Sequence, residues 1–187
     1  MALPAKRKAN YDDLLTVPAH KVAEIVAGDL VVSPRPSIPH ANASSALGAV
    51  VGGPFGFGTG GPGGWVILFE PELHFGDDVL VPDLAGWRRE RMPVAPQTAY
   101  ISLAPDWICE VVSPSTEKLD RADKLPIYAR ERVAYAWLVN PLSRTLEVFA
   151  LEGPRWALLG TFAGDRRVRA VPFDAVEIDL KILWPGN

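Results

Sequence analysis

The chain has 187 residues, which is the length of one domain, and its composition of 48% hydrophobic and 22% charged residues is ordinary for a globular protein with a real core. The net charge of −3 does not indicate a strongly basic nucleic-acid binder, so DNA binding would need a local positive field or metal ions. Its only cysteine, Cys109, excludes an internal disulfide framework. Because there is also no signal peptide and no apolar run of ~18 residues, we expect a cytoplasmic protein without a membrane span.

The N-terminal part predicts small elements separated by prolines. We expect a loose tail over residues 1–10, and one or two short helices over residues 11–26, broken at Pro18, because apolar residues follow there at helical spacing. A short strand is predicted over residues 30–32. Residues 40–51 are small and apolar and favour a helix.

A glycine-rich segment follows over residues 52–64, and we expect it to form a flexible surface loop. It contains a G-x-G-x-x-G match at Gly56, Gly58 and Gly61. The match does not lie between a predicted strand and a helix, and no P-loop lysine follows it. A nucleotide-binding loop is therefore rejected.

The remaining elements predict an α/β (α+β) fold, with a mixed central sheet flanked by helices. The predicted core strands are residues 65–75, 79–87, 107–112 and 134–139. A turn at residues 76–78 should make the first two a hairpin, and a helix should follow Ser113-Pro114. Residues 146–151 and 156–162 predict a further antiparallel pair. No linker divides the chain, so one domain over residues 1–187 is expected.

Two carboxylates in these apolar runs are the candidates for chemistry. Asp83 and Glu110 each lie in or beside a predicted buried strand, where a carboxylate is costly unless it binds a metal or a partner. A hard cation such as Mg²⁺ could bridge them, and Lys124 on the following helix could orient a water. Asp120 lies four residues before Lys124 and could either form an ion pair with Lys124 or Arg121 or face the site. From spacing alone, ordinary structural roles for the two acids remain the stronger alternative.

Other polar groups have weaker signals. The cluster at residues 88–91 is the best local basic patch near Asp83 and could contact phosphates, although a solvated loop is an equal alternative. The three histidines, His20, His40 and His74, lack any short metal-ligand spacing and favour surface or helix-end roles.

A wider set of residues resembles a known family. It comprises Glu24-Ile25-Val26-Ala27-Gly28-Asp29-Leu30-Val31-Val32, His40, Val81-Pro82-Asp83-Leu84, Glu110-Val111-Val112-Ser113-Pro114-Ser115-Thr116, Asp120, Lys124, Tyr128-Ala129 and Trp137-Leu138-Val139. With these residues, roughly residues 20–151 resemble the Uma2 family, also described as domain of unknown function 820. Members of that family resemble the PD-(D/E)XK restriction-endonuclease superfamily.

The resemblance implies a restriction-endonuclease-like core with Mg²⁺ or Mn²⁺ at the sheet. Carried over residue by residue, Asp83 and Glu110 would be the two metal-binding acids, and the Val111 carbonyl would add a ligand. Glu24, expected on an N-terminal helix, would be an accessory acid, and Lys124 would be the catalytic lysine. Glu72, on the predicted hairpin, is a weaker candidate for the same site. The implied function is a metal-dependent endonuclease that hydrolyses DNA phosphodiester bonds as a homodimer.

One departure keeps other functions open. The superfamily lysine normally follows the second acid by two residues, and this chain has Val112 there. Catalysis therefore depends on Lys124 reaching the site. The alternatives are a non-catalytic PD-(D/E)XK-fold protein that binds nucleic acid or protein, and a metal-dependent hydrolase of another substrate.

Overall fold

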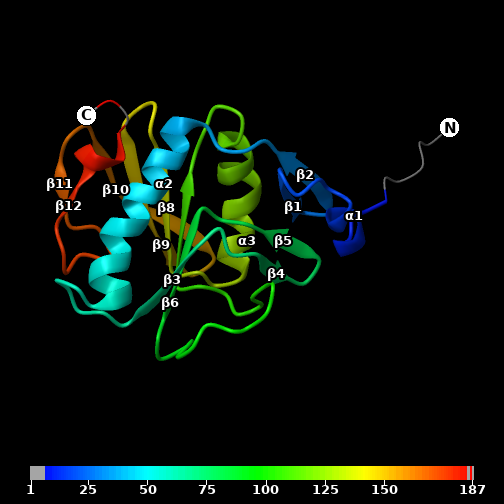
Figure 1. The fold of residues 1–187 in the computed structure, drawn as a ribbon, viewed down its shortest axis with the longest axis horizontal. Coiled ribbons are helices and arrows are strands. Elements are labelled where there is room, and N and C mark those ends of the chain that lie inside the picture. The colour runs from blue at the N-terminus through cyan, green and yellow to red at the C-terminus, as the bar shows by residue number, and fades with distance from the viewer. Residues whose placement is uncertain (1–6, 185, 187) are drawn as a thin grey trace.

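A computed structural model describes residues 7–184 and residue 186, and Figure 1 shows the arrangement of the elements. In chain order they are α1 (Tyr11–Leu15), β1 (Val22–Val26), β2 (Asp29–Ser33), α2 (Ile38–Val51), the π-helix η1 (Gly52–Phe57), β3 (Trp65–Phe69), β4 (Leu73–Phe75), β5 (Asp78–Leu80), β6 (Leu84–Arg88), β7 (Trp107–Val111), the π-helix η2 (Leu119–Lys124), α3 (Leu125–Arg130), β8 (Tyr135–Asn140), β9 (Thr145–Glu152), β10 (Arg155–Ala163), β11 (Arg167–Val168), β12 (Ile178–Asp179) and the 3₁₀ helix η3 (Leu180–Leu183).

The central sheet is mixed, as predicted. Its strand order is β10-β9-β8-β7-β6-β3, and only the β7–β8 pair is parallel. The chain needs a helical crossover to bring β8 parallel to β7, and the segment η2–α3 supplies it. Helices α2 and α3 lie on opposite sides of this sheet (Figure 1). The predicted α/β fold with flanking helices is confirmed.

The two faces of the sheet build two cores because side chains alternate along each strand. On β7, Trp107, Cys109 and Val111 pack in the core that includes α2. Ile108 points to the other face and packs in the core that includes α3. Glu110 shares the parity of Ile108, so the strand directs its carboxylate toward the η2–α3 side.

A second, four-stranded sheet has the order β2-β1-β5-β4, and all its pairs are antiparallel. The predicted hairpin between residues 65–75 and 79–87 is divided between the two sheets. Strand β3 pairs with β6 in the central sheet, whereas β4 pairs with β5 in the small one. The chain crosses between the sheets beside Glu70, whose N–H donates to the Asp83 carbonyl at 3.0 Å. This junction brings Asp83 to the boundary between the sheets.

The prediction of helices up to residue 26 is wrong in its second half. Residues 22–26 form strand β1, which pairs with β2 in register from Val22↔Ser33 to Val26↔Asp29. The turn consists of Ala27 and Gly28, both at positive φ, as a two-residue hairpin turn requires. The apolar spacing fits a helix, but the β-branched residues and this turn decide for a hairpin.

The glycine-rich segment is only partly a loop. Gly52–Phe57 continues α2 as a π-helix, and Phe55 is buried against Phe173. The expectation that residues 52–64 form no regular element is therefore wrong for their first half. Burial of Phe55 stabilises the extension, which then ends at Gly58 in the left-handed conformation.

The N-terminus is also more ordered than expected where it is described. Asn10 caps α1 by accepting from the Asp13 N–H, and the Ala9 N–H donates to the Gly28 carbonyl at 2.8 Å. Of the expected loose tail, residues 1–6 lie outside the described residues. Within the described part of the chain, no helix combines the length and the apolar character needed to cross a bilayer.

Candidate functional site

A cleft of about 290 Å³ opens where the two sheets meet. Strands β1 and β2 line one side, the end of β7 and the turn after it line the other, and the start of α2 closes it. The side chains of Glu24, Asp83, Glu110 and Lys124, all proposed from the sequence, line this cleft. The structure therefore brings together residues that are up to 100 positions apart in the chain, from Glu24 to Lys124.

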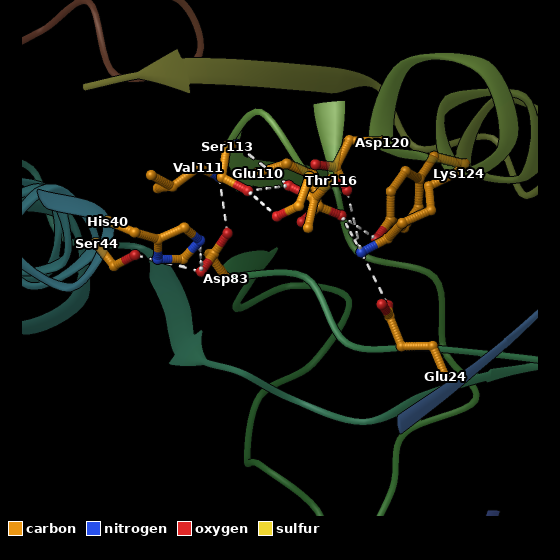
Figure 2. Close-up of polar contacts among 12 residues, drawn as sticks. Glu24, His40, Ser44, Asp83, Glu110, Val111, Ser113, Thr116, Asp120 and Lys124 are labelled. Carbon is orange, nitrogen blue, oxygen red and sulfur yellow. Dashed lines mark hydrogen bonds and ion pairs between the residues drawn. The ribbon is translucent and has the colours of Figure 1, made fainter. Parts of the chain in front are cut away.

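Asp83 is held by the backbone of β7 and by α2. Its Oδ2 accepts a 2.7 Å hydrogen bond from the Val111 N–H. Its Oδ1 accepts from the Ser44 hydroxyl at 3.3 Å and lies 3.3 Å from His40 Nε2 (Figure 2). The Val111 contact ties Asp83 directly to the residue after Glu110, so the two acids are neighbours across the β6–β7 pair.

Glu110 and Lys124 form a buried ion pair. Lys124 Nζ lies 2.8 Å from Glu110 Oε1, and the two side chains are 3% and 4% exposed. The Tyr128 hydroxyl donates to the same oxygen at 2.7 Å. Figure 2 shows Lys124 directed from η2 toward the β7 carboxylate. Both contacts fall on Oε1 of Glu110.

Glu24 and Asp120 complete the surroundings of the ammonium group. Glu24 Oε1 lies 2.8 Å from Lys124 Nζ and also accepts from the Val81 N–H at 2.8 Å. Asp120 Oδ1 lies 3.8 Å from the same nitrogen, one helical turn away. Glu24 is positioned by strand β1, not by the expected helix, and it contacts Lys124 directly.

The cleft holds more carboxylates than cations, and their pKa values reflect this. Burial, reinforced by repulsion from Asp83, Glu24 and Asp120, raises the pKa of Glu110 well above its usual range even though Lys124 lowers it. Burial also raises the pKa of Asp120 to about 6. Burial opposes the charge on Lys124, but Glu110 and Glu24 outweigh it and keep its pKa well above the ordinary value. The ammonium stays charged, whereas the raised pKa values of Glu110 and Asp120 favour the protonated forms of these two acids.

Two residues of the cleft had no firm site role from the sequence. His40 lies on α2 against Asp83, and its buried Nδ1 has no hydrogen-bond partner among the residues that the structure describes. Burial opposes its ionisation, but the hydrogen bond and charge of Asp83 leave the pKa of His40 raised. Burial and the charge of Asp83 raise the pKa of Glu70. The family resemblance included His40 but gave it no role. The sequence did not indicate Glu70 as a site residue, because Glu70 reaches the cleft only where the chain crosses from one sheet to the other.

Other candidates lie elsewhere. Glu72 contacts His74 Nε2 at 2.7 Å and the Tyr11 hydroxyl at 3.2 Å, and it does not line the cleft. The basic cluster at residues 88–91 begins at the far end of β6, five residues or about 16 Å from Asp83. The expectation that Glu72 belongs to the site is therefore wrong, and so is the expectation that the basic cluster lies near Asp83.

Val112 and Lys124 both lie on the α3 side of the central sheet. Val112 is 1% exposed and packs in the core on the α3 side of the sheet, so it presents no polar group. Lys124 reaches Glu110 from the helix that covers the same side. The π-helical turn η2 contains Lys124 and precedes Pro126, which has no N–H to give to a helical hydrogen bond.

The donor set suits a hard cation only with outside ligands. No group of three or more His, Cys, Asp or Glu side chains among the described residues has the arrangement of a complete metal site. Two carboxylates and a backbone carbonyl nevertheless fit Mg²⁺, which keeps several waters in its coordination shell. Burial is the main cause of the raised pKa values of Glu110 and Asp120, and a cation bound beside these acids would favour their ionised forms. The residues present therefore fit a hydrated divalent cation.

Comparisons with known proteins agree with this fold. The sequence matches the Uma2 family, "Putative restriction endonuclease", over residues 9–181. A crystal structure of a "putative nuclease belonging to DUF820" from Anabaena variabilis is 22% identical, and the match covers 94% of this chain and 97% of that chain with a TM-score of 0.70. That likeness shows the fold. No curated protein matches the chain. Because the family match spans nearly the whole sequence, this chain belongs to the Uma2 family.

Proposed function

We propose that this protein is a metal-dependent endonuclease that hydrolyses phosphodiester bonds of DNA. The observation that carries the proposal is the meeting of Asp83, Glu110 and Lys124 in one cleft at the junction of the sheets. Two acids and a lysine around a hydrated cation are the groups that phosphodiester hydrolysis needs. The family description, "Putative restriction endonuclease", supports the same reaction class.

The residues that would hold Mg²⁺ or Mn²⁺ are Asp83, Glu110 and the Val111 carbonyl. Asp83 and Val111 are already joined by a hydrogen bond, which fixes the first acid beside the end of β7. The metal, when bound, supplies a Lewis acid that stabilises charge on a phosphate and lowers the pKa of a coordinated water.

Lys124 and Glu24 are proposed to act together. The ammonium group lies between Glu24 and Glu110 at 2.8 Å from each. From there Lys124 can orient an attacking water or offset negative charge that develops on the phosphate. Glu24 holds the lysine in position, and the Val81 N–H in turn holds Glu24.

A second candidate function is a non-catalytic binding module, and Val112 is the observation that favours it. A chain that had lost catalysis could keep Lys124 solely to neutralise buried carboxylates. We place the cleavage function first because Lys124 keeps its amine beside the candidate metal ligand Glu110. We also propose that the chain is one nuclease-like domain, acts as a homodimer and works in the cytoplasm.

Cleavage of DNA tests the proposal. Purified wild-type protein should cut supercoiled plasmid or linear duplex in Mg²⁺ or Mn²⁺, and EDTA should abolish cutting. Asp83→Asn and Lys124→Met should each reduce the rate by about 100-fold or more, because each removes a charge from the reacting centre.

The matched control is Asp123→Asn, a change of the same kind at an exposed residue next to Lys124. It should keep wild-type cutting. Circular dichroism and thermal melting would establish that every variant is folded. Cutting by folded Asp83→Asn at the wild-type rate would contradict the proposal, and a folded wild type that binds metal without cutting would favour the binding module.

A further inference from the structure

Two cations flank the mouth of the cleft on the small sheet. Lys21 directly precedes β1, and Arg35 follows β2 by two residues. The pairing of Val22 with Ser33 closes the open end of this hairpin, so both cations leave the same end of it. Arg35 Nη2 contacts the Ala19 carbonyl at 3.4 Å, which keeps the turn before β1 next to Arg35. We name Lys21 and Arg35 together the cationic rim.

The rim borders the acidic cleft at Arg35, whereas Lys21 lies one residue outside the lining of the cleft. Arg35 lines the cleft, as do the paired residues Val22 and Ser33. Arg35 is close enough to Glu70 for its charge to lower the pKa of that acid, although burial still leaves it raised. Positive charge thus lies at the mouth, while the carboxylates lie deeper around Lys124.

The positive charges of the rim are available to an outside anion. Lys21 and Arg35 are both exposed, and neither forms an ion pair with any residue that the structure describes. In contrast, Arg91 pairs with Asp106 at 2.7 Å. The rim cations can therefore bind an outside anion without breaking an internal ion pair.

The backbone around Arg35 restricts where this charge can go. Residues 34–37 connect β2 to α2, and Figure 1 shows this connection passing between the small sheet and the start of the helix. Pro34 and Pro36 flank Arg35 and limit the backbone on both sides. The guanidinium group is thus presented from a stiff connection beside the cleft.

We propose that the cationic rim binds the nucleic-acid backbone at phosphates flanking the scissile one. This inference rests on the proposed function, since it takes the acids of the cleft as the place of hydrolysis. A polymer with a phosphate at every nucleotide fits both features, because one phosphate can reach the cleft while its neighbours lie against Lys21 and Arg35. The rim would supply the local positive field that a chain of net charge −3 otherwise lacks.

Binding of an uncut duplex tests the rim separately from catalysis. The probe is a fluorescein-labelled 20-base-pair DNA duplex in Ca²⁺ with the Asp83→Asn background, and anisotropy gives Kd over a series of salt concentrations. The double variant Lys21→Gln/Arg35→Gln should bind roughly tenfold more weakly at low salt. Its plot of log K against log[salt] should be shallower by about 2, because two phosphate contacts are lost.

The matched control is Arg89→Gln/Arg155→Gln, which removes the same charge from two exposed sites away from the cleft. It should keep nearly the parental Kd and slope. The proposal that the rim binds DNA would be overturned if the two double variants lost equal affinity for the duplex, or if the parental protein showed no measurable binding. Rim-dependent binding by a wild type that cuts no DNA in Mg²⁺ would support the rim and contradict the proposed nuclease function.

Discussion

At the scale of single residues, Lys124 organises the cleft. Its ammonium group lies 2.8 Å from both Glu24 and Glu110, and its side chain is only 3% exposed. A buried lysine with two such partners is costly to disturb, because removal of the cation leaves carboxylates buried without compensation. The same contacts keep the amine at a fixed place next to the end of β7. Stability and proposed catalysis therefore depend on the same nitrogen.

Asp120 provides a pH-dependent prediction at this scale. Its pKa is raised from 3.8 to about 6 by burial, so the folded protein binds a proton more tightly than the unfolded chain. That stabilising contribution is complete below pH 3.8 and disappears as the pH rises through about 6. The difference corresponds to about 3 kcal/mol as an upper bound. Asp120→Asn should therefore raise the free energy of unfolding of the metal-free protein at pH 8, by ~1–3 kcal/mol.

Urea unfolding at pH 8 and at pH 4.5 measures this effect. The gain from Asp120→Asn should shrink at the lower pH, where the native carboxyl is already protonated. Asp123→Asn, at an exposed position in the same helical turn, should change stability by less than about 0.5 kcal/mol at either pH. An Asp120→Asn variant that is less stable than wild type at pH 8 would show that its ion pair with Lys124 outweighs its burial.

The sequence predicted the polar residues of the cleft better than their surroundings. Asp83, Glu110 and Lys124 could be proposed because carboxylates in apolar runs and a family motif point to them. The contact between Glu70 and Asp83 could not, because it depends on the chain crossing from one sheet to the other. The sequence did not indicate the rim residues Lys21 and Arg35 either, because only the pairing of β1 with β2 brings these two loop cations together.

At the scale of elements, a glycine on β6 and a glycine on η1 differ in the space available for a side chain. Gly86 lies on β6 between two indoles, and a Cβ there would lie 3.2 Å from Cε3 of both Trp107 and Trp65. A side chain at this point therefore fits only if the indoles move by a few tenths of an ångström. A Cβ added at Gly53, in η1, would have no heavy atom of the described residues within 4 Å, apart from its chain neighbours and the backbone of its own helix, and Gly53 keeps a negative φ.

Alanine substitutions test this difference. Gly86→Ala should destabilise the protein by ~1–3 kcal/mol, because the added methyl group overpacks the two tryptophans. Gly53→Ala should stabilise it by ~0.5–1 kcal/mol, because alanine lowers the entropy of the unfolded chain and favours helix. Chemical denaturation of both variants measures the two values. A stabilising Gly86→Ala would mean that the indoles can separate at little cost.

The elements that were predicted well are those with strong local signals. Residues 107–112 and 134–139 are mostly apolar and rich in aromatic or β-branched side chains, and they form β7 and β8 to within one residue at each end. The error at residues 22–26 arose because five residues can satisfy both a helical and a strand pattern. The helical start of the glycine-rich segment was missed because its stability comes from Phe55, which packs against a distant phenylalanine, Phe173.

At the scale of the whole molecule, the central sheet and the small four-stranded sheet bring acidic side chains to their junction. The connection into β6 contributes Asp83, the central sheet contributes Glu110, the small sheet contributes Glu24, and the crossover between β7 and β8 contributes Lys124. The excess of carboxylates at this junction favours a cation, and the rim outside it favours a polyanion. In this way a protein of net charge −3 would present positive charge beside the cleft in which we propose that DNA is cut.

The central claim, that the cleft binds a divalent cation through Asp83 and Glu110, is tested most directly by calorimetric titration of metal-free protein with Mn²⁺. Wild type should bind one ion per cleft, and Asp83→Asn and Glu110→Gln should each weaken binding by at least about tenfold while remaining folded. Asp123→Asn should bind like wild type. The claim is contradicted if wild-type protein binds no Mn²⁺, or if both substituted proteins bind it with unchanged affinity.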